Sequence, residues 1–288
     1  MTFVVTHEHE CPSDDAPVTP AKKKPRRMFL TEPNQTQYDL HFSLFGVPVR
    51  VHPLFWLVSL LMGFNGGDPK TVLLWVAAVF ISILVHEMGH ALVIQWYGWS
   101  PSVVLYSFGG LAIYSPHMQT NYGPGRSRRN RWTQIIISLA GPGAGFLLAG
   151  LIVAVTWGTG LAQPQVFTFG ETLIPNGYTL IPGERLSQYP YVMTFLMQML
   201  YINIFWGLVN LLPIWPLDGG KIARELFQMA DGGMALRNSL ILSLICAIGM
   251  ALWGFQSGSR FIPIFFAFMA IQNYQDLSGA NRGGGNPW

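Results

Sequence analysis

Long apolar runs separated by short polar or basic segments dominate the chain after about residue 52. Six runs are candidates for membrane-spanning helices, at about 53–64, 70–97, 133–157, 191–212, 238–255 and 261–274. A spanning helix needs about 20 mainly apolar residues, which the second, third and fourth runs supply in full. The first run is short, so it starts earlier or shares its depth with neighbouring structure. The pattern predicts an α-helical polytopic membrane protein with about six transmembrane helices.

Two segments show the alternation of apolar and polar positions that is typical of β-strands. Residues 38–52 alternate around Gly46, and residues 102–114 alternate around Gly109 and Gly110. Glycine between two alternating stretches is a turn signal. We therefore expect short membrane-associated β-hairpins, one before the first span and one after the second.

The two ends of the chain lack these patterns. Residues 1–36 are rich in Pro, Asp, Thr and Lys, and residues 279–288 are rich in Gly. Segments of this kind cannot bury enough apolar surface to fold. We expect a disordered cytoplasmic tail at 1–36, one membrane domain at 37–278 and a flexible C-terminal tail at 279–288.

The composition agrees with a membrane protein. Hydrophobic residues make up 50% of the chain and charged residues only 11%, whereas soluble proteins carry about 25% charged residues. The net charge of +3 is too small to favour nucleic acid as a partner. The two cysteines, Cys11 and Cys246, stand far apart and indicate neither a disulfide framework nor a cysteine-based zinc site.

The distribution of Lys and Arg predicts the orientation. The N-terminal tail, residues 98–132 and residues 213–237 are basic, whereas the other loops contain only Lys70, Arg185 and Arg260. The positive-inside rule therefore places both termini in the cytoplasm, for a multi-pass protein of the plasma or inner cell membrane. The second and fourth spans then both run from outside to inside, so their C-terminal ends reach the same side.

The second span carries ionisable residues with the spacing of a zinc hydrolase. In His86-Glu87-Met88-Gly89-His90 the two histidines lie one helical turn apart, so both imidazoles can reach one metal. Glu87 can then serve as the general base for a water molecule at that metal. Ionisable side chains in a spanning helix are costly and usually mark function. From Thr71 to His86 the helix rises by about 22 Å, which places the motif inside the membrane.

A catalytic zinc site needs a third protein ligand and an open position. The candidate third ligands are Asp218, His117, Glu171, Glu184 and Glu225. Asp218 is the best placed, because it follows the fourth span and the helix-breaking Pro213 and Pro216. The alternative is that Asp218 is an ordinary turn residue, since Asp-Gly is common in turns.

Taken together, the motifs resemble the site-2 proteases, a family of intramembrane zinc metalloproteases. His86-Glu87-x-x-His90 matches the family's helix motif, and the segment from Asn210 to Gly219 matches its second motif, with Asp218 in the position of the third ligand. Phe108-Gly109-Gly110 is similar to its glycine-rich hairpin. No PDZ-like or CBS-like segment is expected, because the loop at 158–190 is too short for a PDZ domain.

One position departs from the pattern of the family. Members often carry Ala-Gly-Pro-x-x-Asn on the third span, whereas this chain has Gly145 in the last place. A polar contact expected there is either missing or supplied by another residue.

The resemblance implies a zinc-dependent intramembrane endopeptidase that hydrolyses a peptide bond within or near a transmembrane helix. Zn²⁺ would be held by His86, His90 and Asp218, with Glu87 as the catalytic base. The expected partners are a single-pass transmembrane substrate and membrane lipid, and a homo-oligomer is compatible with the sequence.

Four residues are candidates for substrate binding: Asn210, Asn203, Gly109 and Gly110. The two asparagines are two helical turns apart and share one helix face. The glycine hairpin could offer a free edge to which a substrate adds as a strand. For both asparagines the alternative is hydrogen bonding between helices of the protein itself.

Two other functions compete with proteolysis. A membrane metal transporter could use the same histidine pair, but it would be expected to show ligands on several spans and an internal repeat, which the sequence does not show. A non-catalytic relative could bind membrane helices only. Retention of Glu87 together with all three candidate ligands argues against this second alternative.

Overall fold

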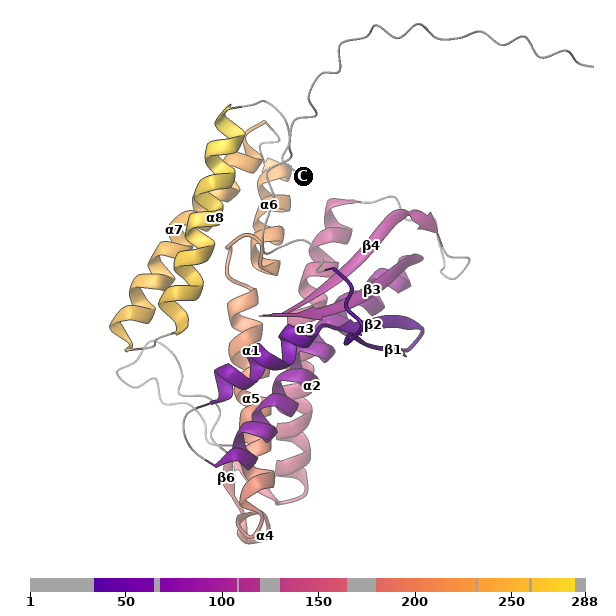
Figure 1. The fold of residues 1–288 in the computed structure, drawn as a ribbon, viewed down its shortest axis with the longest axis vertical. Helices are drawn as coiled ribbons and strands as arrows, with labels where there is room; N and C mark the ends of the chain where they lie inside the picture. Colours follow the sequence, from indigo (N-terminus) through magenta and orange to yellow (C-terminus); the bar gives the residue numbers. More distant parts are fainter. Residues whose placement is uncertain are drawn as a thin grey trace, which may run out of the picture. The chain divides into compact units, whose positions relative to one another are not determined.

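The computed structural model describes residues 34–64, 68–107, 109–119, 130–164, 180–230, 233–258 and 261–282 (Figure 1). The helices are α1 (Pro53–Gly63), α2 (Pro69–Trp96), α3 (Arg131–Gly158), α4 (Glu184–Ser187), α5 (Pro190–Asn210), α6 (Asp218–Ala230), α7 (Ala235–Gln256) and α8 (Phe261–Arg282). The strands are β1 (Leu40–Leu44), β2 (Val47–Val51), β3 (Trp99–Tyr106), β4 (Gly109–Gln119), β5 (Ala162–Pro164) and β6 (Leu180–Pro182). Residues 1–33, Phe108, residues 120–129 and 165–179 of the two predicted loops, and residues 283–288 lie outside the described residues.

Within the described part of the chain, four helices are long and apolar enough to cross a membrane: α2, α3, α5 and α7. They correspond to the second to fifth predicted runs. Helix α1 has only 11 residues, or about 16 Å of rise, which is roughly half of a hydrocarbon core. Helix α8 starts apolar but ends in polar turns that contain Gln272, Asn273 and Asp276. The crossing of the membrane by α1 and α8 stays a prediction.

The ends of α2 follow from local sequence. The Asp68 side chain accepts a hydrogen bond from the backbone N–H of Lys70 at 3.0 Å, and Pro69 occupies the first helical position, both of which favour a helix start. At the other end, Gly98 adopts a φ of 84°, which glycine tolerates without strain. The chain then turns directly into β3.

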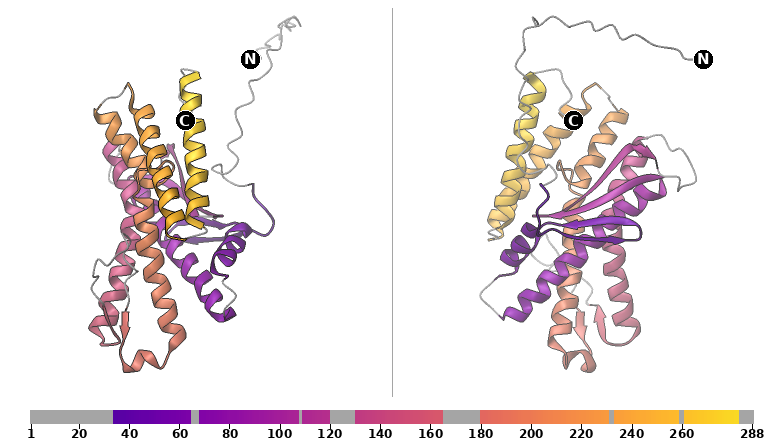
Figure 2. Two further views of the ribbon diagram at one scale, coloured as in Figure 1. Left: turned by 90° about the vertical axis from the view of Figure 1, so that its left-hand side faces the viewer. Right: turned by 45° about the vertical axis from the view of Figure 1, so that its right-hand side comes forward.

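The two predicted hairpins form and join into one sheet with the order β1-β2-β3-β4. Within each hairpin the strands are antiparallel, whereas β2 and β3 run parallel, with Val49 opposite Val103. Both β3 and β4 contact α2 (Figures 1 and 2). Strand β4 therefore forms one edge of this sheet, next to the helix that carries the histidines.

Helices α2, α3 and α5 pack against one another, α6 contacts α3 and α7, and α7 pairs with α8 (Figures 1 and 2). Small residues let α2 and α3 approach closely, because a side chain at Gly89 would meet the Ala140 carbonyl oxygen at 2.5 Å. Large apolar side chains remain on the outer faces, and Leu147 and Phe255 are 77% and 78% exposed. These outer faces suit contact with lipid.

Candidate metal centre

His86, His90 and Asp218 meet at one buried point between α2 and the first residue of α6. The Nε2 atoms of the two histidines are 3.2 Å apart. Asp218 Oδ2 lies 3.2 Å from Nε2 of His86 and 3.1 Å from Nε2 of His90. All three residues are 5% exposed or less. They form the one group of potential metal ligands found in the described residues.

The donor atoms suit a zinc ion. Zinc bonds of about 2.0–2.2 Å at tetrahedral angles place neighbouring ligands about 3.3–3.5 Å apart, close to the 3.1–3.2 Å separations found here. Room for the imidazoles comes from Gly141 on α3, because a Cβ atom there would overlap the rings of both histidines. Two imidazoles and a carboxylate are a donor set that zinc accepts.

His90 is oriented by α3. Its Nδ1 lies 2.6 Å from the carbonyl oxygen of Ile137. A carbonyl only accepts hydrogen bonds, so Nδ1 carries the proton and Nε2 keeps its lone pair toward Asp218. Partners of this kind fix the tautomer and the ring orientation of metal-binding histidines.

Asp218 is positioned by the segment at 211–217, which α7 and α8 hold in place. Ser243 Oγ accepts from the backbone N–H of Trp215 at 2.9 Å, and Asn273 Nδ2 donates to the Trp215 carbonyl at 2.7 Å. Gly219 and Gly220 let α6 start against this segment, because a Cβ atom at either would overlap its backbone. The helix thus breaks before Asp218, as predicted, and contacts with α6, α7 and α8 hold the segment at 211–217 in place.

Lys221 engages the other carboxylate oxygen of Asp218. Its Nζ lies 2.9 Å from Oδ1, whereas Oδ2 faces the two histidines. A buried carboxylate needs a compensating partner, and Lys221 provides one from the next turn of α6. One oxygen is thus kept for the metal position.

Glu87 is buried beside the histidines, at 6% exposure. A Cβ atom at Gly110 of β4 would overlap the Glu87 side chain, with Oε1 only 2.7 Å away. The carboxylate has no hydrogen-bond partner among the residues described. It lies against the edge strand β4 at Gly110.

The two asparagines differ in their contacts. Asn203 Nδ2 donates to Ser82 Oγ of α2 and to the Met199 carbonyl, both at 2.8 Å, as the interhelical alternative predicts. Asn210 Nδ2 donates to the Trp206 carbonyl of its own helix at 3.0 Å. A role of either residue in substrate binding stays a prediction.

Several contributors were not predicted from the sequence: Gly141, the Ile137 carbonyl, Lys221, Ser243 and Asn273. Lys221 is the exception that a pattern could have found, since it stands one helical turn after Asp218. Of the other candidate ligands, Glu184 and Glu225 do not belong to the group found. Glu171 and the side chain of His117 lie outside the described residues.

The sequence of this chain is similar to the sequences of known proteins. A family model for peptidase family M50 matches residues 74–253. A candidate zinc metalloprotease of Synechocystis is 28% identical over 205 residues, which are 66% of this chain and 44% of that protein. Stage IV sporulation protein FB of Bacillus subtilis is 27% identical over 232 residues, which are 79% of this chain and 65% of that protein. The chain thus spans about half to two thirds of the length of these relatives.

Among solved structures, the site-2 protease from Methanocaldococcus jannaschii has a similar fold. The TM-score is 0.50, and the match covers 83% of this chain and 95% of that one. The sequence identity is 20%, so this similarity concerns the fold alone.

Proposed function

The chain belongs to peptidase family M50, and on this premise we propose that it is a zinc-dependent intramembrane endopeptidase. Its substrate would be a single-pass membrane protein, cut within or near its transmembrane helix. The observation that carries the proposal is that Asp218 of α6 meets His86 and His90 beside Glu87, and that these last three residues stand on an apolar helix long enough to cross a membrane. A hydrolytic centre at that depth can reach peptide bonds that lie within the bilayer.

In the proposed mechanism, His86, His90 and Asp218 hold the zinc ion. When bound, zinc would lower the pKa of a water ligand to about 7 and polarise the scissile carbonyl. Glu87 accepts the proton of the water as its oxygen forms the new bond to the scissile carbonyl carbon. Glu87 then passes the proton to the amine nitrogen, and the C–N bond breaks as the amine leaves. Lys221 keeps the Asp218 carboxylate oriented throughout.

The edge strand β4 is proposed to hold the substrate. A transmembrane helix hides its peptide bonds, so the substrate must unwind near the cleavage site. An unwound segment can add as a strand to a free sheet edge. Gly109 has no side chain that could block its approach, whereas the space beside Gly110 is filled by Glu87. Because Gly110 lies against Glu87, such a strand would pass over the catalytic carboxylate.

The proposal is tested by co-expression with a panel of single-pass membrane proteins. Specific products cut within or near the substrate helix are expected, and a zinc chelator that enters membranes should abolish them. If purified, zinc-loaded protein cleaves no member of a broad panel, the proposal of a protease is not supported.

The hairpin gives a sharper test. We expect Gly110→Ala to lower cleavage by roughly tenfold or more, because its Cβ would displace the Glu87 carboxylate, and misplacing a catalytic group by about 1 Å can cost about 100-fold. Zinc content should not change. Leu111→Ala, at the next position of the same strand, is the control and should stay near wild type. Normal cleavage by Gly110→Ala would show that β4 does not determine the position of Glu87.

The proposed orientation places both termini in the cytoplasm. Single cysteines that replace Ser127 and Thr172, in a protein lacking Cys11 and Cys246, should be labelled from opposite sides of the membrane. Ser127 belongs to the basic segment and should react only from the cytoplasmic side. Labelling of both positions from outside would contradict this orientation.

A metal transporter is the weaker candidate. It would be expected to bind the metal on several spans, whereas His86, His90 and Asp218 make up the single ligand group in the part of the chain described. The buried Glu87 beside them is the general base that hydrolysis needs.

A further inference from the structure

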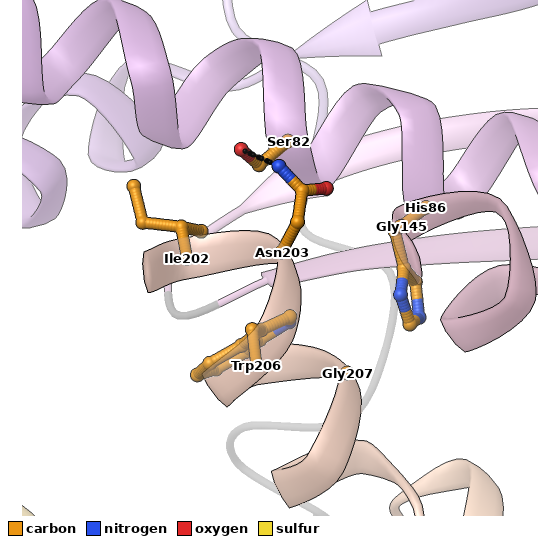
Figure 3. A pocket seen from close by; sticks show the side chains of 7 residues that line it. All are labelled: Ser82, His86, Gly145, Ile202, Asn203, Trp206 and Gly207. Atoms are coloured by element: carbon orange, nitrogen blue, oxygen red, sulfur yellow. Dashed lines mark hydrogen bonds between the residues drawn. The ribbon is translucent and has the colours of Figure 1, made fainter. Parts of the chain in front are cut away.

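A small cavity lies beside the metal centre, between α2, α3 and α5 (Figure 3). Its lining includes Ser82 and His86 of α2, Gly145 of α3 and Asn203 of α5. The volume of the cavity is about 10 Å³. That volume is about what one water molecule needs.

Asn203 presents a hydrogen-bond acceptor to this cavity. Both N–H bonds of its amide are used by Ser82 Oγ and the Met199 carbonyl. The opposite amide orientation would set its oxygen against the Met199 carbonyl oxygen, so the observed orientation is fixed. Figure 3 shows the Asn203 oxygen on the side of Gly145 and His86. A Cβ atom at Gly145 would lie 3.3 Å from that oxygen.

His86 lacks the kind of partner that His90 has. The Nδ1 of His90 donates to the Ile137 carbonyl, whereas the hydrogen-bond contacts of His86 within the described residues all involve Nε2. Metal-binding histidines almost always donate their second ring N–H to a carbonyl, a carboxylate or a water. His86 therefore needs an acceptor, and it lines the same cavity as the Asn203 oxygen.

We propose that one water molecule in this cavity accepts a hydrogen bond from Nδ1 of His86 and donates one to Oδ1 of Asn203. Asn203 is then a positioning residue that orients a metal ligand through water. The inference rests on the proposed metal centre, but not on proteolysis. It also accounts for Gly145, because an asparagine there would fill the cavity and place an amide against the ring from the α3 side.

Cobalt binding tests this link without any cleavage assay, since the visible spectrum of Co²⁺ reports the geometry of its ligands. Asn203→Ala removes the acceptor, and Gly145→Ala narrows the cavity while keeping Asn203 and its contact with Ser82. We expect both variants to weaken Co²⁺ affinity, measured by chelator competition, by about tenfold, within the range of 10- to 100-fold known for partners of this kind. Both should also shift the Co²⁺ spectrum.

Two further variants distinguish a role of Asn203 in orienting His86 from a role in packing α5 against α2. Ser82→Ala removes the interhelical hydrogen bond of Asn203 but keeps its oxygen, so the spectrum should stay near wild type. Adding Gly145→Asn to Asn203→Ala returns an amide to the cavity and should recover affinity. Wild-type affinity and spectrum in Gly145→Ala, with Asn203→Ala changing only thermal unfolding, would overturn the inference. A protein that binds Co²⁺ as expected but cleaves nothing would contradict the proposed protease and not this link.

Discussion

Glu87→Gln is expected to lower the rate of peptide hydrolysis by roughly 10²- to 10⁴-fold, the usual contribution of a general acid–base group. Glutamine has the same shape as glutamate but cannot take a proton from water at neutral pH. The three donor atoms of the metal centre belong to other residues, so zinc content should stay unchanged. The comparison needs single-turnover cleavage of a single-pass substrate and metal analysis of the same preparation.

The matched control is Glu225→Gln. Glu225 is an acidic residue of α6, the helix that begins with Asp218, but it does not belong to the ligand group. It should cleave and bind zinc like the wild type. If Glu87→Gln cleaves at a near wild-type rate, the general-base role is wrong. If the variant loses zinc as well, Glu87 supports the metal centre and its effect on cleavage says nothing about proton transfer.

The four helices that meet the length and composition of membrane spans could be predicted because each is one continuous apolar run. The region before α2 was harder to predict, since α1 has only 11 residues, about half of what a membrane span needs. Both hairpins were predicted from alternation around Gly46 and around Gly109 and Gly110. Their union through the parallel pairing of β2 with β3 was not, because that pairing joins segments separated by the whole of α2.

Some features of the metal centre could also be predicted from the sequence, and others could not. The spacing of His86 and His90 fixes their common helix face, and loop charge placed Asp218 on their side of the membrane. The contacts that hold these residues depend on distances between helices, which no local pattern encodes. The small residues of α3 predicted a close helix approach, but not that Gly141 would face two imidazoles.

The second large effect is expected for substitution of Asp218, because this residue is the one metal-ligand candidate that α6 contributes. Asp218→Ala should weaken zinc binding by more than about 100-fold, beyond the 10- to 100-fold typical of partners outside the ligand set. It removes the oxygen that lies 3.1–3.2 Å from both histidine nitrogens, and with it one of the three donor atoms of the metal centre. Chelator competition on purified protein measures the change.

Glu225→Ala, two turns further along α6, is the control for loss of an acidic group from this helix and should keep wild-type affinity. Thermal unfolding of the metal-free proteins shows whether the Asp218 variant is folded. Ser243 and Asn273 hold the preceding segment through hydrogen bonds to the backbone of Trp215, which the substitution does not remove, so the fold should survive. Unchanged zinc content and affinity in folded Asp218→Ala would mean that the third ligand is another residue and that Asp218 only starts α6.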